Sequence, residues 1–94
     1  LQGKRTSDNS PFDVIKGNIA IEIKTIIRGE NPKITMHPDA KKRKEEFSVL
    51  HNLNSFTVVF HQPSNSIYYR KGIGSFRLAN MEKVSYQQLQ QVIR

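Results

Sequence analysis

The chain has 94 residues, which is the size of one small domain. With 36% hydrophobic and 24% charged residues it has the composition of a globular protein, and no apolar run approaches the ~20 residues of a membrane span. It contains no cysteine, which excludes a disulfide framework and a thiolate metal site. A net charge of +7 favours a polyanionic partner, with nucleic acid ahead of an anionic membrane surface.

The first predicted elements are an arm and a β-hairpin. Residues 1–11 are polar and rich in turn formers, which predicts a flexible arm before a single folded domain at 12–94. Apolar and polar residues then alternate on either side of Gly17-Asn18, a turn dipeptide with glycine first. This pattern predicts strands at 12–16 and 19–27.

The rest of the chain predicts two helices and further short strands. Pro38 and Asp39 suit the first turn of a helix, and Ser85 can cap a second one. In chain order we expect a loop at 28–33, a short strand at 34–36, a helix at 38–52, strands at 55–61, 67–70 and 76–78, and a helix at 86–93. The buried stripe of the first helix is predicted to contain Ala40, Phe47, Leu50 and Val49 or Leu53. The order β-β-(β)-α-β-β-(β)-α predicts an α/β (α+β) fold with helices on a central mixed sheet.

The two-residue turn sets the register of the hairpin. It pairs Lys16 with Ile19 and, counting outward, Asp13 with Glu22. The face predicted to join the core carries Phe12, Val14, Ile21 and Ile23. The opposite face carries Asp13, Ile15, Ala20, Glu22 and Lys24.

Two carboxylates are thus predicted to oppose each other, with Cα atoms about 4.5 Å apart in a non-hydrogen-bonded pair. Like charges directly opposite are destabilising, and a divalent cation such as Mg²⁺ or Mn²⁺ between Asp13 and Glu22 would remove the repulsion. Lys24 on the same face could orient a water or neutralise a phosphate. The alternative is a solvated hairpin face on which Lys24 simply pairs with Glu22.

Two stretches resemble the signature of the PD-(D/E)XK nuclease superfamily, which includes restriction endonucleases and Holliday-junction resolvases. They are residues 10–13 (SPFD) and 19–25 (IAIEIKT). That signature is an Asp on one strand and (D/E)-x-K on the next antiparallel strand, followed by a helix and another strand. Asp13 and Glu22-Ile23-Lys24 match it, and the resemblance covers about residues 3–61. Two features depart from the pattern: Pro11 lies one place early, and the usual first helix has no counterpart.

The resemblance implies a restriction-endonuclease-like core lacking the first helix, and a metal-dependent endonuclease acting on DNA rather than RNA. It implies that Asp13 and Glu22 hold Mg²⁺ or Mn²⁺, that Lys24 completes the catalytic set, and that the protein forms a homodimer. Residues 68–78 resemble the end of domains fused to phage minor head proteins, which would account for a chain that begins with Leu1. Since no secretory signal is visible, we expect the cytoplasm or a phage virion.

Basic residues along the chain are predicted to contact phosphates without reading sequence. They are Lys4, Arg5, Arg28, Lys33, Lys41, Lys42, Arg43, Arg70, Lys71 and Arg77. Two alternatives stay open. One is a module of a phage structural protein that binds nucleic acid without cutting it. The other is a metal-free ribonuclease or tRNA-cleaving toxin that uses two of His37, His51 and His61 as acid and base.

Overall fold

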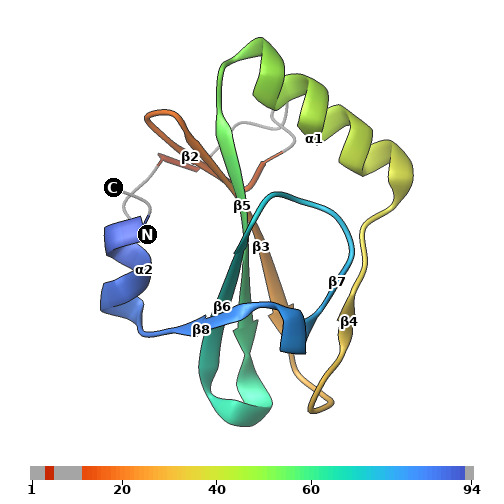
Figure 1. Cartoon of the computed structure of the whole chain (residues 1–94), viewed down its shortest axis with the longest axis vertical. Helices are drawn as coiled ribbons and strands as arrows, with labels where there is room; N and C mark the ends of the chain where they lie inside the picture. Colours follow the sequence, from red (N-terminus) through yellow and green to blue (C-terminus); the bar gives the residue numbers. More distant parts are fainter. Residues whose placement is uncertain (1–3, 6–11, 93–94) are drawn as a thin grey trace.

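A computed structural model describes residues 4–5 and 12–92 (Figure 1). The elements are β1 (Lys4–Arg5), β2 (Val14–Lys16), β3 (Ile19–Ile26), β4 (Lys33–Ile34), α1 (Pro38–Leu50), β5 (Asn54–His61), β6 (Ser66–Lys71), β7 (Phe76–Arg77), β8 (Glu82–Val84) and α2 (Tyr86–Val92). Two short 3₁₀ turns, Gln62–Ser64 and Leu78–Asn80, connect strands. The predicted α+β class with a central mixed sheet and two helices is confirmed.

The main sheet has the strand order β1-β2-β3-β5-β6-β8. Strands β3 and β5 are parallel and α1 connects them, whereas every other neighbouring pair in this sheet is antiparallel. The hairpin register is as predicted near the turn, with Lys16 opposite Ile19 and Val14 opposite Ile21. Gly17 has a φ of 58°, which this tight turn requires and which glycine adopts without strain.

The sheet buries apolar side chains on both faces. On one face, Ile21 and Val58 pack with Leu89 of α2. On the other face, Ala20 lies in a cluster that includes Phe47 of α1, and Val59 lies in a cluster with Ile34 of β4. Figure 1 shows α1 and α2 at opposite sides of the view, with the sheet between them. Within the described ranges, no helix is long and apolar enough to cross a membrane.

The start of the hairpin differs from the prediction. Strand β2 begins at Val14 rather than at residue 12, and Phe12 and Asp13 form a bend. The bend breaks the alternation of side chains, so Phe12 packs with Ala20 on the α1 side rather than with Val14. The Phe12 ring lies 6.2 Å from that of Phe47, centroid to centroid. Burial of this ring under α1 favours the bend over another residue pair in the ladder.

The predicted stripe of α1 is also partly wrong. The helix ends at Leu50 rather than at residue 52, and Val49 and Leu50 are 83% and 79% exposed. The buried helical residues are Lys44 and Ser48, with Ala40 and Phe47 half-buried. These four positions recur at the spacing of a single helical face, so a charged side chain occupies the centre of the face that packs on the sheet.

Other boundaries shift by one or two residues, and two strands were missed. Residues 4–5 of the predicted arm form β1, which pairs with β2, while the rest of that arm lies outside the described residues. The strand predicted at 34–36 is instead Lys33–Ile34, which pairs with β7. The other missed strand, β8, pairs with β6. Its residues, Glu82-Lys83-Val84, lack the apolar alternation that identifies a strand.

Candidate functional site

Strand β3 places Glu22 and Lys24 on the sheet face that α1 covers. They alternate with Ile21 and Ile23, whose side chains pack on the α2 side. The Lys24 Nζ lies 3.5 Å from Glu22 Oε1. The two side chains differ in exposure, since Lys24 is 37% exposed and Glu22 only 10%. The predicted pairing of these residues on one face is therefore present, with Lys24 on the solvent side.

The sequence-based site did not include Lys44, which supplies the shortest contact to Glu22. Its Nζ lies 3.0 Å from Glu22 Oε2, and its side chain is 11% exposed. The same ammonium lies 5.4 Å from the centroid of the Phe12 ring. Lys44 lies within a run of charged residues at the start of the helix, and such a run by itself suggests a solvated surface. The signal that identifies it is its position four residues after Ala40 and three before Phe47, both in the predicted stripe.

Asp13 is exposed, and its carboxylate is anchored to the backbone of β3. Asp13 Oδ2 accepts a hydrogen bond of 2.8 Å from the N–H of Ile23, and the Asp13 N–H donates to Ile21 O at 3.1 Å. The predicted direct pair of Asp13 and Glu22 in the ladder is therefore not formed, because the ladder ends at Val14. The bend still places the Asp13 carboxylate at the backbone of β3, at the residue between Glu22 and Lys24.

The neighbouring strands and loop define the rest of this face. Thr57 of β5 lies beside Glu22 in the parallel register and is buried, with its hydroxyl donating to Gly72 O at 2.8 Å. Arg70 of β6 lies opposite Thr57, and its guanidinium stacks 4.4 Å from the centroid of the Phe76 ring. The Arg70 guanidinium thus lies two strands away from Glu22. The segment after β6, which contains Gly72 and Phe76, packs over this face of the sheet.

The donor set suits a Mg²⁺ ion that is shared with a substrate. Asp13 keeps one carboxylate oxygen outside its hydrogen bond with Ile23, and Glu22 is an ionisable carboxylate among cations. In the described part of the chain, no group of three or more His, Cys, Asp or Glu could hold a metal ion. Mg²⁺ typically keeps several waters and binds through one or two carboxylates plus substrate phosphates. An ion held by Asp13 and Glu22 would therefore need further ligands from water and substrate, since these residues do not form a closed protein cage.

The basic residues predicted to bind nucleic acid fall into separate groups. Lys33 and Arg77 are directly opposite in the two-stranded β4–β7 ribbon and are exposed, while their neighbours Ile34 and Phe76 pack inward. Lys41 lies against Gly74. In contrast, Lys71 occupies the α2 side of β6, because it follows Arg70 in the strand.

The remaining basic residues do not join these groups. Lys42 is 4.0 Å from Glu46 along α1, Arg43 is exposed on the same helix, and Arg28 is exposed after β3. Lys4 and Arg5 form β1, and their side chains lie outside the described residues.

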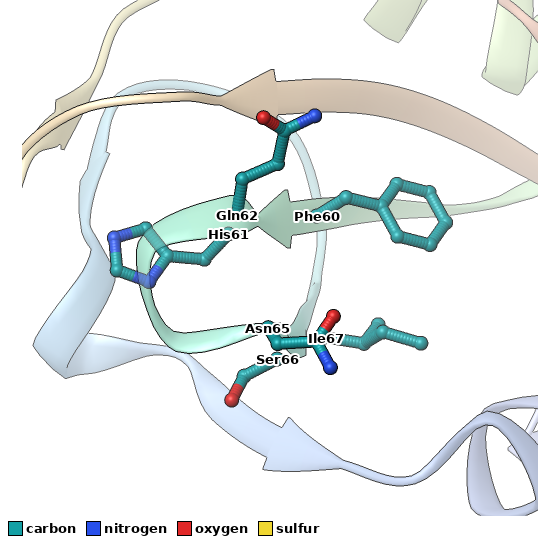
Figure 2. Close-up of a pocket in the computed structure, with 6 residues that line it drawn as sticks. All are labelled: Phe60, His61, Gln62, Asn65, Ser66 and Ile67. Atoms are coloured by element: carbon teal, nitrogen blue, oxygen red, sulfur yellow. The ribbon is translucent and has the colours of Figure 1, made fainter.

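Each histidine has a structural contact of its own. His37 caps α1 by accepting from the N–H of Asp39 at 3.1 Å, and the His51 ring lies 4.3 Å from that of Phe47. His61 is buried, with Nδ1 2.6 Å from Ser64 Oγ and Nε2 2.6 Å from Gly29 O. Its ring borders a pocket of about 350 Å³ and points away from Phe60 and Ile67, as Figure 2 shows. These contacts tie two loops together and do not assemble an acid–base pair.

Comparison with protein-family models, with curated proteins and with solved structures gave no significant match for this chain. The functional assignment therefore depends on the residues and geometry described above.

Proposed function

We propose that this protein is a divalent-metal-dependent nuclease that hydrolyses phosphodiester bonds of nucleic acid, with DNA as the preferred substrate. One observation carries the proposal. The Asp13 carboxylate is hydrogen-bonded to the backbone N–H of Ile23, the residue that separates Glu22 from Lys24. The Asp13 carboxylate therefore lies at the backbone of β3 between Glu22 and Lys24, at the end of β2 away from the turn.

Each of the three side chains has a distinct role in the proposed site. Asp13 and Glu22 would hold the ion. A bound ion lowers the pKa of a water, so that hydroxide forms more readily for the attack, and it stabilises negative charge on the phosphate. Lys24 extends toward solvent from beside Glu22, so its ammonium can meet the phosphate or orient the attacking water. The hydrogen bond from Ile23 holds one oxygen of Asp13, which leaves the other oxygen for the ion.

The charge distribution supports a polyanionic substrate. The net charge is +7, and Lys33 and Arg77 present two cations side by side on the β4–β7 ribbon. Cross-strand like charges are unfavourable by themselves, and an anion bound between them relieves the repulsion. This arrangement suits contacts with phosphates along a strand, which position a duplex without reading its sequence. The homodimer, the phage fusion and the cellular location stay predictions from the sequence.

The experiment compares wild type with Glu22→Gln on supercoiled plasmid, single-stranded DNA and RNA, each with Mg²⁺, Mn²⁺ or EDTA. Glu45→Gln, an exposed carboxylate of α1 outside the site, is the matched control. We expect cutting that requires metal, prefers DNA and falls about 100-fold or more in Glu22→Gln but not in Glu45→Gln. Cutting that persists in EDTA would instead identify the metal-free ribonuclease.

A binding module without catalysis is the second candidate, and the Glu22–Lys44 contact favours it. This ion pair already satisfies Glu22 without a metal, as in a purely structural buried pair. If the protein is a binding module, we expect it to bind plasmid, single-stranded DNA and RNA in a salt-sensitive way and to cleave none of them. The same assay therefore separates the two candidates when binding is measured beside cleavage.

A further inference from the structure

We propose that Lys44 couples metal binding to phosphate binding at this site. Its ammonium opposes a divalent cation at Glu22 until a substrate phosphate binds both the cation and the ammonium. The inference rests on the proposed function, because it concerns the ion that Asp13 and Glu22 would hold. It adds Lys44 to the site. It also predicts that the ion and nucleic acid each bind more tightly when the other is bound.

The first step concerns the position of the ammonium. Lys44 Nζ is 3.0 Å from Glu22 Oε2, closer than Lys24 Nζ is to Oε1 at 3.5 Å. The Lys44 side chain is also much less exposed, at 11% against 37%. The side chain starts from the face of α1 that packs on the sheet, and its ammonium lies over the Phe12 ring. Lys24 can turn toward water, whereas Lys44 is held at the carboxylate.

The second step concerns charge. A divalent cation bound to Glu22 would lie within a few ångströms of the Lys44 ammonium, where little water screens their repulsion. The carboxylate would also have to share its negative charge between the ammonium and the ion. An exposed lysine would relieve the repulsion by moving into solvent, and the burial of Lys44 hinders this movement. Metal binding by the protein alone is therefore weakened.

The third step concerns the substrate. A phosphodiester carries one negative charge, so a phosphate bound at this face would be attracted by the Lys44 ammonium and by an ion held at Asp13 and Glu22. Its charge would offset the repulsion between the two cations. Coupling of this kind is reciprocal: if the metal tightens binding of nucleic acid, nucleic acid tightens binding of the metal by the same factor.

The experiment measures this coupling without catalysis. A short DNA duplex is titrated with protein, by fluorescence anisotropy, in Mn²⁺ and in EDTA at matched ionic strength, and gel electrophoresis of the same samples checks that the duplex stays intact. Binding of Mn²⁺ to the protein alone is measured by electron paramagnetic resonance. For wild type we expect Mn²⁺ to tighten duplex binding about fivefold or more. For Lys44→Met we expect Mn²⁺ alone to bind about fivefold more tightly and the coupling to disappear.

The matched control is Lys83→Met, which removes an equal charge from an exposed position on β8, outside the predicted phosphate contacts. It should leave both the Mn²⁺ affinity and the coupling at wild-type values. Lys44→Arg keeps the positive charge and should keep weak binding of Mn²⁺ alone. If Lys44→Met fails to fold, because Glu22 loses its nearest partner, Lys44→Gln takes its place, since it removes the charge but keeps a hydrogen-bond donor for Glu22. It should show the same tighter binding of Mn²⁺ and the same loss of coupling.

Two results overturn the inference. In the first, wild type binds Mn²⁺ and cuts DNA, yet Mn²⁺ leaves duplex affinity unchanged or folded Lys44→Met binds Mn²⁺ no more tightly. The proposed function then survives and only the role of Lys44 fails. In the second, wild type and the folded variants neither bind Mn²⁺ nor cut, and the proposed function fails together with the inference.

Discussion

Asp13 joins two roles in one side chain. Its carboxylate ends the β2–β3 ladder by accepting from the Ile23 N–H, which no residue of β2 reaches because that strand begins at Val14. The other oxygen of the same carboxylate is the one that we propose for the metal. Substitutions at Asp13 can therefore separate the structural role from the chemical one.

Asp13→Asn should keep the structural role, because the amide oxygen can accept the same hydrogen bond. We expect its free energy of unfolding in urea to lie within about 0.5 kcal/mol of wild type. Asp13→Ala removes the acceptor and should lower the free energy of unfolding by about 1 kcal/mol. Equal stabilities of the Asn and Ala variants would show that the hydrogen bond contributes nothing.

Tyr69 gives the fold a pH dependence at high pH. Its hydrogen bond to Glu82, its partial burial and the negative charge of Glu82 raise the pKa of Tyr69 above the ordinary value of 10.0. A raised folded-state pKa stabilises the protein fully below the ordinary value, and this contribution is lost as the pH rises through the raised pKa. Tyr69→Phe should therefore flatten the decline of the free energy of unfolding above about pH 10. An unchanged decline in urea titrations at several pH values would refute this role for Tyr69.

The β4–β7 ribbon carries the clearest phosphate-binding prediction among the secondary-structure elements. Lys33 and Arg77 are cross-strand neighbours and both exposed. Changing both to Gln should weaken duplex binding and reduce the slope of log affinity against log salt by about 2, one unit for each lost phosphate contact. The fold should not suffer, because a like-charge pair is removed. Lys71→Gln, on the other side of the sheet, is the control, and a loss of affinity half as large as that of the double variant would contradict the assignment.

The elements differ in how far the sequence could predict them. The Gly17-Asn18 turn fixes the hairpin locally, so the register from Lys16 to Val14 and the shared face of Glu22 and Lys24 followed from the sequence. The bend at Phe12 depends on the ring of Phe47, more than thirty residues away, so no local pattern could show it. The burial of Lys44 depends on Glu22 in the same way. A lysine is usually exposed, so its charge predicts an exposed position for Lys44. Its burial follows from the contact with Glu22, which the sequence does not show.

On the scale of the whole molecule, the fold explains the position of the proposed site. Parallel pairing of β3 and β5 requires a crossover connection, and α1 supplies it. The helix covers the face that carries Glu22 and brings Lys44 to it. Strand β2 is short, so Asp13 lies at its open end and is accessible to solvent. The site residues thus lie at the border between the core and solvent, with Glu22 buried, Lys24 partly exposed and Asp13 exposed.

The most direct test is plasmid cleavage by wild type and Asp13→Asn in Mg²⁺, with EDTA as the metal-free control. Since the Asn variant keeps the hydrogen bond to Ile23, a change in cleavage reports the loss of a charged metal ligand rather than loss of fold. We predict metal-dependent cutting by wild type and a fall of about 100-fold or more for Asp13→Asn. Cutting by Asp13→Asn at the wild-type rate would contradict the assignment of Asp13 as a metal ligand and with it the proposed nuclease site.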